Sequence, residues 1–155
     1  MPVMTLAQFR TMVGKHLGTS PWLEVTQEMI NLFAEATGDD QFIHLDPDRA
    51  RLTPFKGTVA QGFLSLSLMP RLFDMADASR PSGVEVSVNY GGNRVRFLSP
   101  VRSNSRVRGR FTLLALEEKQ PGQFQMTIEY VLELENADKP ALIAEWITLL
   151  ICTDT

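Results

Sequence analysis

The sequence predicts an α+β fold in which an antiparallel sheet packs against a buried helix. Apolar residues recur at helical spacing in the first half of the chain, whereas from Val84 onward they alternate with polar residues. At the junction lies Val59–Ala76, whose apolar residues point to most sides of a helical wheel, as in a helix that is buried on most sides. Helices followed by a run of strands are typical of the α+β class.

The composition indicates one ordinary globular domain spanning residues 1–155. The chain is 44% hydrophobic and 21% charged, so it has enough apolar material for a core and too little net charge for disorder. A formal charge of -3 argues against a general nucleic-acid binder. The single cysteine, Cys152, excludes an intramolecular disulfide and fits a cytoplasmic location. No apolar run reaches the length of a membrane span.

Local signals place three helices in the first half. Thr5–Val13 is expected to form a short helix, and Ser20–Val25 a break with a short extended piece. Thr26 is a good N-cap for a helix through about Ala36, and Gly38 can end that helix in the left-handed conformation. Asp46 and Pro47 suit the start of a third helix, Pro47–Leu52. The segment Gly38–Leu45 is then a short loop.

The rest of the chain is predicted to form one long helix and four or five long antiparallel strands. Val59–Ala76 forms the helix, with Pro70 bending it or ending a segment. Alternation from Val84 onward marks strands around Val86–Tyr90, Val95–Phe97, Val107–Ala115 and Ile128–Leu134, and in Leu142–Cys152, of which the last is apolar on both faces. Turn residues at Pro121-Gly122 and Asn136–Pro140 separate the later strands.

Of the two histidines, His44 is the candidate for chemistry. It shares the predicted loop with Asp39 and Asp46, whereas His16 has no acidic neighbour and is expected to be exposed and neutral in function. A carboxylate and an imidazole in one loop can bind the same water and act as general acid and base. Two alternatives stay open on spacing alone: Asp39 ends a helix while His44 packs, or Asp39, His44 and Asp46 bind a metal.

Several stretches together resemble a known family. The segment Phe33–Asp46, FAEATGDDQFIHLD, is followed by Ala50, Phe55 and Gln61-Gly62, then by NYGGNRVRF at Asn89–Phe97 and SPV at Ser99–Val101. Lys139–Leu142 and Ala144-Glu145 match a last strand. This pattern, from about Thr26 to Leu150, resembles the MaoC-like family of (R)-specific enoyl-CoA hydratases, including its NodN-like branch. Gln41-Phe42 and Gln61 replace the asparagine-proline pair and the histidine usual in that family.

The resemblance implies a hotdog fold, a long central helix wrapped by an antiparallel sheet, assembled as a homodimer. It implies a hydratase that adds water to a trans-2-enoyl-CoA to give the (R)-3-hydroxyacyl-CoA, with Asp39 and His44 activating the water. The backbone N–H of Gly62 would contact the thioester oxygen. No cofactor is needed, because coenzyme A is part of the substrate. The alternatives are an acyl-CoA thioesterase of the same fold and a non-catalytic acyl-CoA-binding subunit.

An arginine-rich stretch adds a candidate substrate-binding surface. No acidic residue lies between Val86 and Leu116, yet this stretch holds six of the eleven arginines: Arg94, Arg96, Arg102, Arg106, Arg108 and Arg110. Asn93, Arg94 and Arg96 are the predicted contacts to the acyl-CoA, whose phosphates suit the arginine fork. A solvated sheet face and RNA binding are the alternatives.

Overall fold

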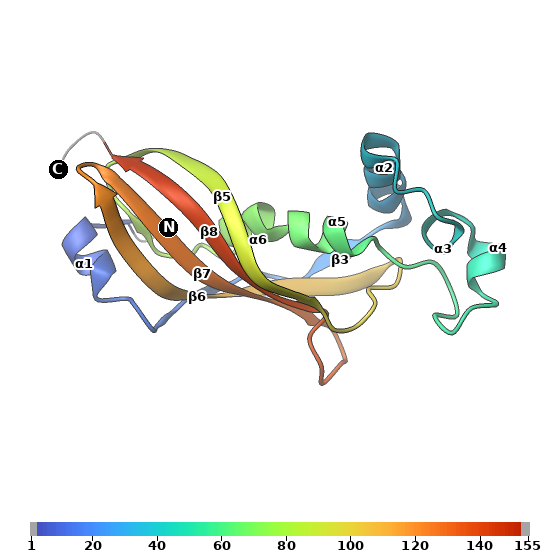
Figure 1. The fold of residues 1–155 in the computed structure, drawn as a ribbon. Coiled ribbons are helices and arrows are strands. Elements are labelled where there is room, and N and C mark those ends of the chain that lie inside the picture. The colour runs from blue at the N-terminus through green and yellow to red at the C-terminus, as the bar shows by residue number, and fades with distance from the viewer. Residues whose placement is uncertain (1–2, 153–155) are drawn as a thin grey trace.

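The computed structural model describes residues 3–152, and its centre is one six-stranded antiparallel sheet (Figure 1). The strands follow the order β2-β6-β7-β8-β5, and β3 pairs with β6 beside β2. Their bounds are β2 His16–Thr19, β3 Leu23–Val25, β5 Val84–Phe97, β6 Ser105–Gln120, β7 Gln123–Leu134 and β8 Leu142–Cys152. The prediction of long antiparallel strands in the second half is therefore confirmed.

Alternation along the strands gives the sheet one buried face. In β7 the inward residues Phe124, Met126, Ile128, Tyr130 and Leu132 are all buried, while Glu129 between them is only half-buried. The polar residues therefore lie on the outer face, and the apolar ones face the helical segment. Phe111 stacks on Tyr130 and meets Phe73 edge to face, so aromatic rings fill the core between sheet and helix.

The predicted central helix is shorter than expected and consists of two parts. It comprises α5, Gly62–Ser67, and α6, Met69–Met75, with Leu68 between them and Pro70 in the first turn of α6. The prediction that it begins at Val59 is wrong, because the backbone there bonds elsewhere. Val59 forms a bridge with Arg102, and the Ala60 N–H donates to Val101 O at 2.7 Å. Extended chain therefore precedes Gly62.

Four helices precede α5: α1 Leu6–Arg10, α2 Gln27–Thr37, α3 Phe42–Leu45 and α4 Pro47–Ala50. Thr26 and Asp46 cap α2 and α4 through their side-chain oxygens, as predicted, and Thr5 caps α1 in the same way. Helices α1 and α4 end earlier than predicted. The interpretation of Gly38–Leu45 as a loop is wrong over its second half, where α3 forms.

Three short strands were not predicted. Strand β2 pairs with β6, and β1, Val3–Met4, pairs in parallel with β4, Arg80–Pro81. His16 begins β2, is exposed as expected, and its Nε2 lies 3.1 Å from Thr19 Oγ1. These strands have little alternation of their own, so their pairing partners determine them.

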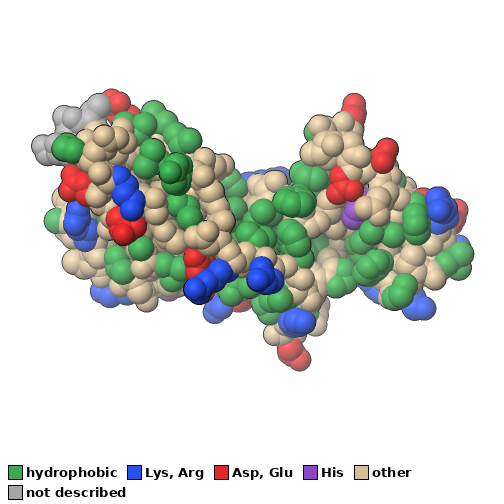
Figure 2. All heavy atoms as spheres, viewed as in Figure 1, with side chains coloured by type: hydrophobic (Ala, Val, Ile, Leu, Met, Phe, Trp, Pro, Cys, Tyr) green, Lys and Arg blue, Asp and Glu red, His purple; other side chains and the backbone are tan. Residues whose placement is uncertain are grey.

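Helices α2, α3 and α4 lie together at one end of the molecule, beyond the sheet, and α1 lies at the other end (Figure 1). Hydrophobic side chains gather on the surface between the sheet and the α2–α4 end (Figure 2). Strand β5 forms one edge of the sheet, and its Val86, Val88, Tyr90 and Phe97 are exposed. None of the helices within residues 3–152 is both long and apolar enough to cross a membrane.

Candidate active site

The segment from Asp39 to His44 is shaped by the end of α2 and the start of α3. Gly38 has φ 77°, the left-handed conformation, and its N–H donates to Ala34 O at 2.8 Å, which ends α2. The chain then turns, and the His44 N–H donates to Gln41 O at 3.0 Å as α3 begins. These two backbone bonds fold the segment so that Asp39 and His44 face each other.

The His44 imidazole is held in one orientation. The side chain is buried, and its Nδ1 lies 2.6 Å from the carbonyl oxygen of Val59. A carbonyl oxygen only accepts hydrogen bonds, so Nδ1 carries the hydrogen and donates it. In the neutral ring Nε2 is then the acceptor. The free lone pair of His44 therefore lies on the side of the ring away from Val59.

The carboxylate of Asp39 lies on that free side. Its Oδ1 is 3.8 Å from His44 Nε2, beyond the range of a direct hydrogen bond. The side chain of Asp39 is 37% exposed, against 8% for His44. Two acceptors at this separation can each accept one hydrogen of a single water molecule. The arrangement can therefore orient a water and accept a proton from it.

Gln27, on α2, ties the His44 backbone to the chain before α5. Its Nε2 donates to His44 O at 2.7 Å, and its Oε1 accepts from Thr58 Oγ1 at 2.6 Å. The amide nitrogen of Gln27 thus bonds α3, and its amide oxygen bonds the chain before α5. Sequence reasoning missed Gln27 and Thr58, because neither lies in the matched motif and no spacing in the sequence connects them.

Gln61 makes a second tie, between α2, Asp39 and the start of α5. Its side chain is fully buried, and Nε2 donates to Ile30 O and to Asp39 O, both at 3.2 Å. Gln61 is also the N-cap of α5, so the residue after it, Gly62, is the first residue of that helix. The position occupied by histidine in the resembling family thus holds a buried amide that connects Asp39 with Gly62.

Gly62 and His44 line the same cavity, of about 310 Å³. The N–H of a first helical residue has no acceptor within its helix, so that of Gly62 is available to a ligand. A Cβ at this position would lie 3.1 Å from the Phe97 ring, so glycine permits Phe97 to pack against the helix start. The wall is completed mainly by apolar residues: Ile43, Phe55, Val59, Ala60, Ser65, Leu98, Ser99, Pro100, Val101 and Ala141.

The predicted substrate contacts Asn93, Arg94 and Arg96 do not line this cavity. All three lie exposed on β5. Arg94 has φ 51° where the pairing of β5 with β8 shifts register, and its Nη1 lies 3.6 Å from Glu145 Oε1. Arg96 Nη1 donates to Val95 O at 2.8 Å.

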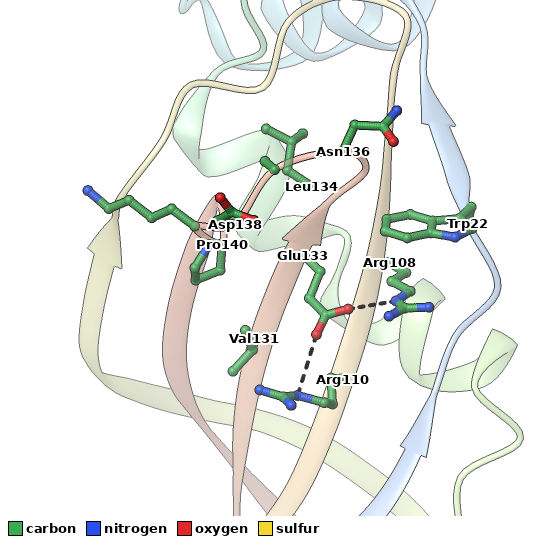
Figure 3. A pocket seen from close by; sticks show the side chains of 11 residues that line it. Trp22, Arg108, Arg110, Val131, Glu133, Leu134, Asn136, Asp138 and Pro140 are labelled. Atoms are coloured by element: carbon green, nitrogen blue, oxygen red, sulfur yellow. Dashed lines mark hydrogen bonds and ion pairs between the residues drawn. The ribbon is translucent and has the colours of Figure 1, made fainter.

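The arginine-rich stretch is largely neutralised by acids from neighbouring strands. Glu133, on β7, lies 2.6 Å from Arg108 Nε and 3.7 Å from Arg110 Nε, in the hollow that Figure 3 shows. Arg108 also lies over the Trp22 ring, and Arg106 bonds Glu135 at 3.1 Å. The interpretation of these arginines as a free basic surface is therefore wrong, because the acids that pair with them come from outside the stretch.

Arg96 and Arg102 differ from the other four. Within residues 3–152 neither forms an ion pair, and both are exposed. They bracket the segment 97–101, which forms one wall of the His44 cavity. The two unpaired arginines of the stretch therefore flank this wall segment in the sequence.

The alternative metal site is not assembled. The carboxylate of Asp46 caps α4 and accepts from the Arg49 N–H at 3.0 Å. Among the described residues, no three His, Cys, Asp or Glu side chains converge to ligate one ion. Asp39 and His44 remain as a pair, without the third ligand that this hypothesis requires.

Comparison with known proteins gives concordant matches. Residues 8–136 match the family model described as a MaoC like domain. The chain is 43% identical to Nodulation protein N of Rhizobium leguminosarum bv. viciae, covering 97% of this chain and 93% of that one. It is also 43% identical to 3-hydroxyacyl-thioester dehydratase Z of Mycobacterium tuberculosis, covering 91% and 92%. The solved (R)-hydratase of A. caviae superposes with a TM-score of 0.69 at 22% identity, covering 85% and 94%, which confirms the hotdog fold.

The Gln61 side chain should contribute to stability, because its removal leaves the carbonyl oxygens of Ile30 and Asp39 without their hydrogen-bond donor. Gln61→Met keeps the side-chain size but removes the donor to the buried carbonyl group of Ile30 and the partly buried one of Asp39. We expect the free energy of unfolding in urea to fall by about 1–3 kcal/mol. The matched control is Gln41→Met, since Gln41 is exposed and makes no side-chain cap. Equal losses in the two variants would contradict the connecting role of Gln61.

Proposed function

The chain belongs to the MaoC-like hydratase and dehydratase family, and on that premise we propose that it is an (R)-specific enoyl-CoA hydratase. It adds water to a trans-2-enoyl-CoA to give the (R)-3-hydroxyacyl-CoA, and the reverse reaction uses the same site. The observation that carries this proposal is the orientation of His44. Its Nδ1 is held by Val59 O, and its Nε2 faces Asp39 beside a cavity that Gly62 also lines.

In the proposed reaction Asp39 and His44 bind one water between them. The water oxygen forms a bond to C3 of the enoyl group while one water proton passes to the pair. The electrons of the C2–C3 double bond move toward the thioester oxygen, which gives an enolate. The pair then returns a proton to C2. Atoms and charge balance without any cofactor, and coenzyme A enters only as part of the substrate.

Gly62 is proposed to stabilise the enolate. Its N–H is the first of α5, so it has no acceptor within the helix, and Gly62 lines the same cavity as His44. A fixed backbone donor at the oxygen where charge develops lowers the barrier without reorganisation during the reaction. The replacement of histidine by Gln61 leaves this donor in place.

Two observations support a coenzyme A thioester as the substrate: the name of one relative and the positive charge of two unpaired arginines. The mycobacterial relative is named a dehydratase of 3-hydroxyacyl thioesters. Arg96 and Arg102 are exposed, form no ion pair within residues 3–152 and directly flank the cavity-lining segment 97–101 in the sequence, and their guanidinium groups suit the phosphates of coenzyme A. The cytoplasmic location stays a prediction.

We also propose a homodimer that forms through β5. This strand is a long edge with exposed apolar residues, and it has no partner on its free side among residues 3–152. Such an edge is a template for pairing with another chain. Antiparallel pairing of two β5 strands around a two-fold axis would satisfy both edges with the same contacts.

The sharpest test removes the two groups one at a time. Asp39→Asn and His44→Ala should each lower kcat for hydration of crotonyl-CoA by a factor on the order of 10² to 10⁴, the usual worth of a positioned acid or base. Because both act on one water, the double variant should lose far less than the product of the single effects. Enoyl absorbance follows the reaction.

The control is Asp40→Asn, since Asp40 is adjacent and exposed. It should stay within a few-fold of the unmodified chain, and damage equal to that of Asp39→Asn would shift the assignment by one residue. A parallel free-thiol assay detects thioesterase activity. Hydration that survives both single variants, or thiol release in its place, would overturn the proposed mechanism.

Arg96 and Arg102 should contribute to binding rather than chemistry. Arg96→Gln combined with Arg102→Gln should raise KM for the enoyl-CoA by about three- to tenfold at low salt, because two exposed charge contacts are worth at most ~1 kcal/mol each. The effect should shrink with added salt while kcat holds. Arg106→Gln with Arg110→Gln is the matched control, and an equal rise in KM there would count against the assignment.

The dimer is tested by sedimentation at micromolar concentration, where we expect twice the mass of one chain. Val88→Lys places a charge on the β5 edge and should shift the protein toward monomers. Val13→Lys is the control, because Val13 is 45% exposed and Val88 is 44% exposed. A monomeric unmodified chain would refute the dimer.

A further inference from the structure

Ser65, on α5, carries a buried hydroxyl without a partner in the His44 cavity. The residue is only 4% exposed and lines that cavity. Its backbone carbonyl accepts from Tyr130 Oη at 3.3 Å, but its Oγ forms no hydrogen bond with any residue in 3–152. Ser65 Oγ is also not among the three unpartnered polar atoms there that are sealed from solvent, so it keeps some accessible surface. A group bound in the cavity can therefore reach this hydroxyl.

The neighbouring serine on α5 shows how a hydroxyl on a helix is usually satisfied. Ser67 Oγ donates to Phe63 O, four residues earlier, at 2.7 Å. The equivalent carbonyl for Ser65 is that of Gln61, which already accepts from the N–H groups of Leu64 and Ser65 at 3.1 and 3.2 Å. The Ser65 hydroxyl does not join them. Because a buried hydroxyl is almost always bonded, its partner must come from outside the chain.

Ser65 lies one helical turn after Gly62. Both residues line the same cavity, and residues three apart lie on one side of a helix. Three residues advance the helix by about 4.5 Å. Because Cα–Cβ bonds tilt toward the N-terminus of a helix, the Ser65 side chain leans back toward Gly62. An oxygen that accepts from the N–H of Gly62 can therefore accept from the Ser65 hydroxyl as well.

The groups around the cavity divide into acceptors and donors. His44 Nε2 and the carboxylate of Asp39 accept, which suits the hydrogens of a water molecule. Gly62 offers an N–H and Ser65 an O–H, both on α5. Ser99, the other hydroxyl residue of the wall, is less buried and comes from the chain after β5. The two donors on α5 suit an oxygen that becomes negative.

We propose that the Ser65 hydroxyl is a second donor to the thioester oxygen, beside the N–H of Gly62. This inference rests on the proposed function, because the oxygen becomes negative only when an enoyl thioester is hydrated. As the electrons of the C2–C3 double bond move toward that oxygen, two fixed donors stabilise the enolate better than one. The hydroxyl keeps its proton throughout, so the balance of the reaction is unchanged.

The test is Ser65→Ala, which removes the hydroxyl and keeps the backbone bonds of the residue. The free energy of unfolding in urea should change little, because the hydroxyl has no partner within residues 3–152. In contrast, kcat for hydration of crotonyl-CoA should fall by a factor on the order of 10² to 10³, the usual worth of one oxyanion donor. KM should change less, because the hydrogen bond is strongest to the charged oxygen of the transition state.

Ser67→Ala is the matched control. It is the same substitution on the same helix, but Ser67 is exposed and does not line the cavity. It should keep the kcat of the unmodified chain. An unchanged kcat in Ser65→Ala, or an equal loss in both variants, would overturn the inference.

The infrared carbonyl stretch of bound butyryl-CoA separates this inference from the proposed function. Butyryl-CoA is saturated and cannot be hydrated, and an isotope label on the thioester carbon identifies its band. A hydrogen bond to a carbonyl lowers its stretching frequency, so Ser65→Ala should raise the frequency of the bound thioester and Ser67→Ala should not.

The combined outcomes are distinct. An active chain in which Ser65→Ala leaves the carbonyl frequency unchanged would overturn the inference and leave the activity standing. A chain that hydrates nothing but shows the shift on Ser65→Ala would refute the activity and uphold the contact. An inactive chain without that shift would overturn both.

Discussion

The hydrogen bond from His44 Nδ1 to the carbonyl oxygen of Val59 is the constraint on which the rest of the site depends. It fixes both the tautomer and the orientation of a buried ring. The acceptor is available because the chain around Val59 is extended and bridges Arg102 instead of joining the helix. A helix that began at Val59 would bind this carbonyl within its own first turns. The orientation of His44 therefore depends on α5 beginning only at Gly62, because this leaves the Val59 carbonyl free to accept from the imidazole.

A small set of buried amides holds the parts around that bond. Gln27 joins α2, α3 and the chain before α5, and Gln61 joins α2, Asp39 and α5. Hydrogen bonds in such a water-poor environment are costly to leave unmade, so these ties resist small displacements. The apolar core lies on the other side of α5 and α6, against the sheet. Packing against the sheet thus fixes the position of α5 and α6, and the hydrogen bonds of the Gln61 amide hold Asp39 next to α5.

Sequence reasoning succeeded where the signal is local. The Thr26 cap and the left-handed Gly38 need only neighbouring residues, and the period of two along β7 follows from its one buried face. Sequence reasoning failed where a residue's conformation or pairing depends on a partner that is distant in the sequence. Helix α3 has four residues and owes its place to tertiary contacts. The pairing of Arg108 with Glu133 joins residues that are 25 positions apart. The proximity of Asp39 and His44 could be anticipated because they share one segment, whereas Gln27 was missed because its partners are remote.

Strand β5 connects the sheet edge with the site. Its last residue, Phe97, packs against Gly62 and meets Phe63 edge to face, and the next four residues continue the cavity wall. Its earlier residues form an exposed apolar edge that also reaches, through Ser87 and Asn89, a second cavity of about 520 Å³ between α6 and the sheet. Contacts that a partner makes along this edge would bear on both cavities at once, because one continuous strand forms part of each. The proposed pairing of two β5 strands would therefore contact the strand whose last residue, Phe97, packs against Gly62.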